Sequence, residues 1–175
     1  MSNQDSTESR LAFVDISVFD DGSIRGGILV TDMETRPYEF RVTTPVKPTS
    51  MQRILYGKTL SEYVYGELIA FPLVKAVKEK ISLVVVKNEN LLIMRPKISL
   101  PVVVITKSAI GVEGKNPVVS IGTFSFHSHL SYAGEADWAK TLLTDLLERH
   151  DPFEPFERLK IAMNEVHKNK IGVMK

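Results

Sequence analysis

Asp15 is the residue whose position most clearly requires a chemical explanation. It stands in the stretch Phe13-Val14-Asp15-Ile16-Ser17, whose apolar, β-branched composition is typical of a buried strand. Burying a carboxylate is costly unless it is paired, hydrogen-bonded or bound to a cation. Two interpretations follow: Asp15 is a divalent-metal ligand at the centre of a sheet, or it faces an edge and pairs with a neighbouring arginine.

His127-Ser128-His129 is a second candidate. Alternate residues of a strand point to the same side, so both imidazoles could face one metal ion. Two histidines alone do not complete a metal site, and the aromatic residues around them favour a structural role or a contact with a partner. Both interpretations stay open.

Tyrosines and cations lie close together in residues 47–65: Lys47, Arg53, Tyr56, Lys58, Tyr63 and Tyr65. Such a mixture can stack bases and hold phosphates, although tyrosines at this density also occur where a helix packs on a sheet or in a protein interface. We expect Lys47, Arg53 and Lys97, with Lys107, to form a basic surface that binds nucleic acid.

Net charge names no partner, because the 175 residues include 22 basic and 21 acidic side chains. The charges are unevenly distributed, however. Residues 25–58 and 87–115 each carry a net +3, whereas residues 1–24 carry −4 and residues 135–168 carry −3. Two basic stretches that converge on one face would attract phosphates.

Several classes of protein are excluded by what the sequence lacks. It has no cysteine, so disulfides and thiolate metal sites are absent. It also lacks a lysine-bearing phosphate loop, a dinucleotide fingerprint, a His-Glu-x-x-His motif and a Gly-x-Ser-x-Gly elbow. No apolar run approaches the roughly 20 residues of a membrane span. We expect a cytoplasmic protein without a signal peptide or membrane association.

The first half of the chain predicts three antiparallel strands followed by helices. Apolar strands are expected over 11–19, 24–31 and 38–44, and Asp20-Asp21-Gly22-Ser23 is a hairpin turn signal. Thr49 or Ser50 can cap a helix, and Thr59-x-x-Glu62 fits a capping box for a second helix that begins near Leu60.

The second half predicts buried parallel strands and two C-terminal helices. The runs 81–86 and 100–106 are apolar throughout, as in strands covered on both faces. A further strand is expected over 118–126, and helices over 136–150 and 155–168. Gly26-Gly27, inside a strand, indicates a bulge or tight packing. The predicted fold class is α/β: a mixed sheet of RNase H-like order, with helices on both faces.

Three segments resemble endonuclease V-type proteins, a branch of the RNase H-like nuclease superfamily. They are Val14-Asp15-Ile16-Ser17, the apolar run from Leu100 to Thr106 with Lys107-Ser108 after it, and Tyr65-Gly66-Glu67 before an apolar helix and strand. The resemblance covers roughly residues 11–114 and rests on short motifs. Other phrases, among them 48–57 and 154–158, look like those of bacterial proteins without an assigned function.

The resemblance implies a site with Mg²⁺ or Mn²⁺. Asp15 would match the family's first metal carboxylate and Glu67 its helix-start glutamate, while Lys107 would match the lysine that contacts the reacting phosphate. Such enzymes use metal ions to activate water and to stabilise charge on a phosphodiester. The family places an aspartate after the strand that ends at Val86; here Lys87 stands there, and Glu89 is the nearest substitute.

The sequence therefore predicts a disordered tail over residues 1–10 and a single domain over residues 11–175. The predicted function is that of a divalent-metal-dependent nuclease or a nucleic-acid-binding protein, and the resemblance implies Asp15, Glu67 and Glu89 at the metal. The alternative is a catalytically inactive subunit of the same fold that binds a protein partner or forms a homo-oligomer. Lys87 favours the alternative, because an ammonium group repels a metal ion.

Overall fold

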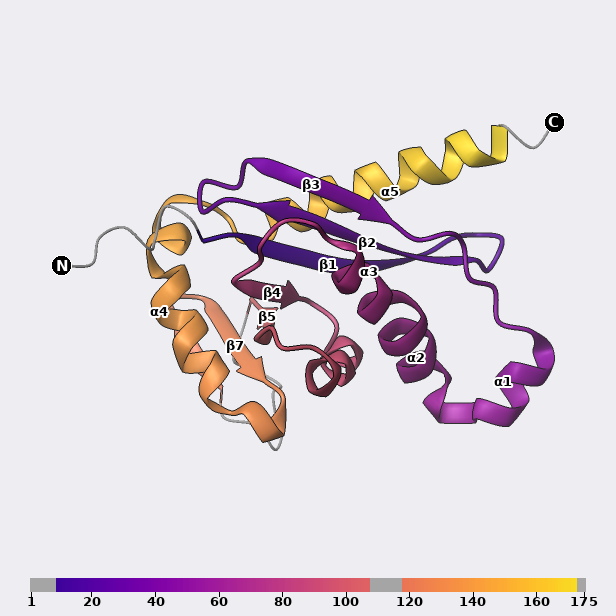
Figure 1. Cartoon of the computed structure of the whole chain (residues 1–175), viewed down its shortest axis with the longest axis horizontal. Helices are drawn as coiled ribbons and strands as arrows, with labels where there is room; N and C mark the ends of the chain where they lie inside the picture. Colours follow the sequence, from indigo (N-terminus) through magenta and orange to yellow (C-terminus); the bar gives the residue numbers. More distant parts are fainter. Residues whose placement is uncertain (1–8, 108–117, 173–175) are drawn as a thin grey trace.

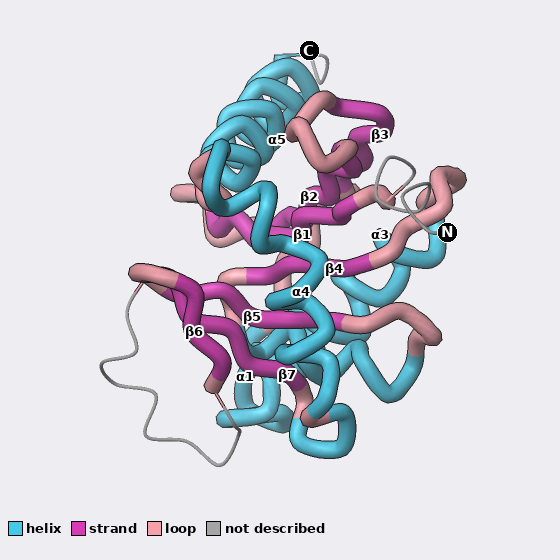
Figure 2. Tube along the Cα trace, turned by 90° about the vertical axis from the view of Figure 1, so that its left-hand side faces the viewer, coloured by secondary structure: helices cyan, strands magenta, loops and turns pink. Residues whose placement is uncertain are grey.

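One seven-stranded mixed sheet organises the chain. The computed structural model describes residues 9–107 and 118–172, and the strands run in the order β3-β2-β1-β4-β5-β7-β6. Figure 2 shows the strands, in magenta, one below another from β3 at the top to β7 near the bottom, and Figure 1 shows the helices around them. The predicted mixed sheet is confirmed.

The first three strands form an antiparallel meander: β1 (Leu11–Val18), β2 (Ile24–Thr31) and β3 (Pro37–Val42). Gly22 turns the chain between β1 and β2 with φ of +78°, a conformation that glycine adopts without steric cost. The bounds of β2 are those that the sequence predicts.

The central strands β4 (Leu83–Val86) and β5 (Val102–Thr106) run parallel to β1. All four residues of β4 and the first four of β5 are buried. A strand covered on both faces needs apolar residues at every position, which explains the continuous valine runs. This prediction is confirmed.

The single strand predicted over 118–126 is wrong. The structure has a hairpin instead, with β6 (Val119–Ile121) antiparallel to β7 (Phe124–Ser128). Gly122 lies between the two strands with φ of +56° and so permits a tight reversal. β7 then pairs antiparallel with β5.

Five short helical segments follow one another between β3 and β4: α1 (Ser50–Tyr56), η1 (Gly57–Thr59), α2 (Leu60–Glu62), η2 (Tyr63–Ala70) and α3 (Phe71–Ala76). The capping box lies at the start of α1, where Thr49 and Gln52 exchange hydrogen bonds. The predicted box at Thr59 is wrong: its hydroxyl donates to the Tyr56 carbonyl instead.

The segment η2 is π-helical: the N–H of Phe71 donates to the carbonyl of Gly66, five residues back. Gly66 does not break the helix. Instead it leaves room for Ile93 of the segment η3 (Glu89–Lys97), since a Cβ there would overlap the Ile93 side chain. Pro72, which has no N–H, lies at the point where the π-helical segment passes into α3.

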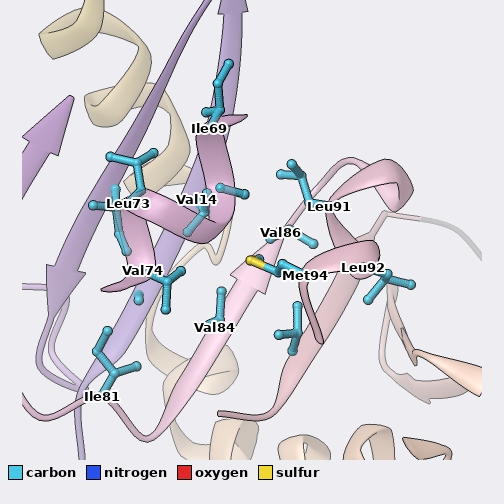
Figure 3. Close-up of a cluster of buried hydrophobic side chains, with 14 of the residues drawn as sticks. Val14, Ile69, Leu73, Val74, Ile81, Val84, Val86, Leu91, Leu92 and Met94 are labelled. Atoms are coloured by element: carbon cyan, nitrogen blue, oxygen red, sulfur yellow. The ribbon is translucent and has the colours of Figure 1, made fainter. Parts of the chain in front are cut away.

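Helical layers cover both faces of the sheet, as predicted. On one face η2, α3 and η3 enclose a core with Val14, Val84 and Val86, drawn in Figure 3. On the other face α4 (Gly134–Arg149) and α5 (Glu154–Gly172) pack on Phe13 and Val85. A short segment, η4 (Leu130–Tyr132), precedes α4.

Gly26 and Gly27 bring these layers close to β2. A Cβ on Gly26 would overlap Ile69 of η2, and a Cβ on Gly27 would lie 2.8 Å from Leu159 Cδ1 and from Met163 Sδ of α5. Successive residues of a strand face opposite sides of the sheet. Gly26 therefore allows η2 to pack closely on one face, and Gly27 allows α5 to pack closely on the other. The predicted tight packing is confirmed.

The predicted tail, residues 1–10, lies largely outside the described residues. Arg10, at the end of this predicted tail, lies over the Tyr38 ring and pairs with Glu79. Within the residues that the structure describes, no helix is long and apolar enough to cross a membrane.

Candidate functional site

Asp15 lies in β1 beside the end of β4, and its partner is a lysine. Val14 of β1 is in register with Val86 of the parallel strand β4. The residues that follow them, Asp15 and Lys87, therefore also lie side by side. Lys87 Nζ is 3.0 Å from Asp15 Oδ2, and the Asp15 side chain is only 13% exposed. The structure thus shows a paired Asp15, with a lysine in place of the expected arginine and in the interior of the sheet rather than facing an edge.

A hollow of about 300 Å³ opens beside this pair, on the face that α5 covers. Asp15, Ser17 and Lys87 line it from the sheet, and Lys160 and Asn164 line it from α5. Two ammonium groups, a hydroxyl and an amide therefore surround one carboxylate that is already paired. The hollow presents donors with net positive charge, which suits an anion rather than a cation.

Lys107 lies on the same face of the sheet, just beyond the end of β5. Its Nζ is 4.9 Å from the centre of the Phe153 ring, and Lys87 Nζ is 5.0 Å from the centre of the Phe156 ring. These two rings are neighbours, with centroids 6.4 Å apart. The attraction between an ammonium group and an aromatic face favours the conformation in which each lysine side chain extends over its ring. Both lysines are thus held at the carboxyl ends of adjacent parallel strands.

The other two predicted ligands do not join Asp15. Glu67 lies on η2, on the opposite face of the sheet, where its Oε1 is 2.9 Å from Lys97 Nζ. Glu89 begins η3, and its Oε1 is 2.9 Å from Nε2 of His127. The sheet separates these two carboxylates from Asp15, and each of the three has a cationic or imidazole partner.

The donor set does not fit Mg²⁺ or Mn²⁺. Both ions prefer several carboxylate or water oxygens, yet in residues 9–107 and 118–172 no three histidine or acidic side chains are grouped to hold a metal ion. Around Asp15 the additional charged groups are lysines. The structure does not bring Asp15, Glu67 and Glu89 together in one group.

His127 and His129 have separate surroundings. His127 lies on β7 opposite Val104, so it faces η3; its side chain is 3% exposed. Its Nε2 approaches Glu89 outside hydrogen-bond geometry, and its Nδ1 has no partner among the described residues. His129 caps η4 by accepting the N–H of Ser131. For His129 the structural interpretation holds.

The remaining predicted basic residues are dispersed. Lys47 is exposed near the turn between β1 and β2, close to Gly22. Arg53 is exposed on α1, and Lys97 is paired with Glu67 on the face opposite Asp15. No contact in the described part of the chain joins these three residues to the hollow beside Asp15.

Two residues of the hollow, Lys160 and Asn164, were not singled out by the sequence. Their spacing of four residues does place them on one face of the last predicted helix. Only the packing of α5 over β1, made possible by Gly27, shows that this face turns towards Asp15. A lysine–asparagine spacing is too common to be recognised by itself.

The comparisons with known proteins place the fold. No family model matches the chain, and no curated protein sequence matches it. Among solved structures, human ENDOV superposes with a TM-score of 0.60 at 14% identity, over 93% of this chain and 86% of that one. The catalytic domain of human endonuclease V gives a TM-score of 0.52 at 12% identity, over 97% and 87%.

A third structure is endonuclease V of Ciona intestinalis, in complex with a 24mer DNA containing an inosine followed by a ribo-adenosine. It gives a TM-score of 0.51 at 10% identity, over 92% of this chain and 87% of that one. At such identities the likeness establishes the fold alone. The resemblance to endonuclease V-type proteins is therefore confirmed at the level of the fold: the chain has the RNase H-like fold of the endonuclease V structures.

Proposed function

We propose that the protein binds nucleic acid at the hollow beside Asp15 and does so without metal-dependent cleavage at that residue. The observation that carries this proposal is the position of Lys87, whose Nζ lies 3.0 Å from Asp15 Oδ2. That ammonium group lies against one oxygen of the carboxylate and repels a cation that approaches it. It offsets the negative charge of Asp15, so the surrounding lysines give the hollow a net positive charge.

Phosphate is the ligand chemistry that these residues fit. The ammonium groups of Lys87 and Lys160 and the amide of Asn164 donate hydrogen bonds, and Lys107 adds a further cation at the same edge. A phosphodiester offers only acceptors and one negative charge, so it matches such a set of donors. The fold adds support, since the Ciona endonuclease V that shares it was solved with DNA.

The binding experiment measures fluorescence anisotropy of labelled single-stranded and duplex DNA and of single-stranded RNA at increasing salt. We expect binding that weakens steeply with salt, because phosphate contacts release counterions. Lys107→Gln and Lys160→Gln should each lower the slope of log K against log salt by about 0.7–0.9 for the contact that is lost. Lys140→Gln, on the exposed side of α4, is the matched control and should leave the slope unchanged.

The catalytic part of the proposal is tested on the same oligonucleotides. Incubation with Mg²⁺ or Mn²⁺ should give no cleavage beyond that seen with a chelator. Cleavage that depends on the metal and is lost in Asp15→Asn would establish the nuclease instead. Absence of binding to every oligonucleotide at low salt, or binding that Lys107→Gln and Lys160→Gln leave unchanged, would overturn the phosphate site.

A further inference from the structure

The helix α1 exposes an apolar stripe that no part of the fold uses. Met51, Ile54 and Leu55 are 62%, 74% and 74% exposed, and none of the seven residues of α1 is buried. Their spacing of three and four residues places them on one side of the helix. Figure 1 shows α1 at the end of the molecule, away from the sheet. Folding alone does not explain why large aliphatic side chains stand there.

The stripe belongs to a built element rather than to a loose loop. The capping box of Thr49 and Gln52 fixes the start of α1. At its end, the ring of Tyr56 stacks on that of Tyr63, with centroids 4.4 Å apart and planes 16° apart. A helix held at both ends presents its side chains in one arrangement, and this lowers the entropic cost of binding a partner.

The charged residues of α1 and of the chain directly beside it are cationic. Lys47, Arg53 and Lys58 are exposed, and residues 40–61 contain no aspartate or glutamate. Within the described part of the chain, no ion pair joins Arg53 or Lys58 to a carboxylate; the described ion pairs involve other residues. The helix α1 therefore presents an apolar stripe next to two exposed cations, Arg53 and Lys58, which no ion pair among the described residues neutralises.

This combination distinguishes among three occupants. A second copy that docked α1 against α1 around a two-fold axis would bring Arg53 and Lys58 of both copies together, which like-charge repulsion disfavours. Nucleic acid would satisfy the cations but would leave the aliphatic stripe facing phosphates and water. A protein groove with an apolar floor and acidic side chains at its rim satisfies both features.

We propose that α1 inserts the stripe of Met51, Ile54 and Leu55 into an apolar groove of a different protein, whose acidic rim pairs with Arg53 and Lys58. Residues at spacings of three and four that enter a groove are the usual anchors of helix-in-groove recognition. In such interfaces a few central side chains provide most of the affinity and charged residues at the rim guide association.

The test places the photo-crosslinking residue p-benzoylphenylalanine at position 54 of the full chain and irradiates the cells that express it. The proposal requires one protein to be crosslinked, and that protein, once purified, to bind the unmodified chain in calorimetry. Leu55→Ser and Arg53→Glu should each weaken this binding by about tenfold or more, as expected for an apolar anchor and a charged rim. Ile161→Ser, at an apolar residue of α5 that is 62% exposed, is the matched control and should leave the affinity unchanged.

Several results would overturn the proposal. They are crosslinking only to a second copy, only to nucleic acid or only to lipid, crosslinking to nothing, and a captured protein that binds Leu55→Ser or Arg53→Glu as tightly as the unmodified chain. Because α1 buries no residue, these variants are expected to fold, and circular dichroism verifies that they do. Nucleic acid is absent from the calorimetry, so its outcome does not depend on the phosphate site.

Discussion

Removing either member of the Asp15–Lys87 pair measures how firmly the lysine is held against the carboxylate. Two unit charges 3.0 Å apart attract each other by about 5.5 kcal/mol at an effective dielectric constant of 20 and by about 1.4 kcal/mol in water. The Asp15 side chain is 13% exposed and that of Lys87 is 32% exposed, so the pair lies between these limits. Desolvation and the lost freedom of the lysine side chain reduce the net gain further, to about 1–2 kcal/mol.

The assay is a double-mutant cycle of Asp15→Asn, Lys87→Met and the double variant, with the free energy of unfolding measured by urea denaturation. Lys87→Met should cost more than Asp15→Asn, because it leaves a largely buried carboxylate without its cation, whereas an unpaired lysine can extend into water. A coupling energy below about 0.3 kcal/mol, within the usual error of additivity, would refute the reasoning. A coupling of the expected size is the free energy that a metal ion would have to supply in order to displace Lys87.

Three further outcomes are expected. The variant Lys87→Asp should bind Mn²⁺ weakly beside Asp15, because two adjacent carboxylates replace an ion pair. Electron paramagnetic resonance measures this binding, and equal signals from the variant and the unmodified chain would contradict the site geometry. Gly27→Ala should destabilise the fold by about 1–3 kcal/mol in urea denaturation, because the new Cβ would lie 2.8 Å from Leu159 Cδ1; a cost near zero would show that α5 moves away freely. Burial alone would raise the pKa of Glu39, but hydrogen bonds from two backbone N–H groups and an arginine hold that pKa below its usual 4.5. Stability should therefore fall as the pH drops below about 5, and Glu39→Gln should flatten this decline in urea titrations from about pH 6 to pH 3; an unchanged slope would exclude Glu39 as its source.

Much of the fold could be predicted from the sequence because burial acts directly on residue type. The runs that became β4 and β5 are apolar at every position, since both sides of each strand are covered. The hairpin of β6 and β7 was missed because Gly122 alone reverses the chain between two short strands. A single glycine inside a strand-like run does not reveal whether the chain bends or turns back.

The candidate site was only partly predictable. Asp15 stood out because a carboxylate in an apolar strand needs a partner. The resemblance placed Lys87 at the same site, but their direct pairing depends on the register of two strands far apart in the chain. Glu67 and Glu89 were placed by their order along the chain, and order does not determine which face of a sheet a residue reaches. Lys160 and Asn164 depend on how α5 is rotated over the sheet, which is a property of tertiary packing.

The adjacent glycines of β2 also discriminate between the native register of β2 on β1 and registers shifted by one residue. If β2 slid by one residue along β1, one glycine would take the place of the other, and a large side chain would occupy the position that was vacated. A slip in one direction would bring Ile28 beneath α5, and a slip in the other would bring Arg25 beneath η2. In either case one helical layer could no longer close on the sheet. Docking of the two layers is thus compatible with a single alignment of β2 on β1.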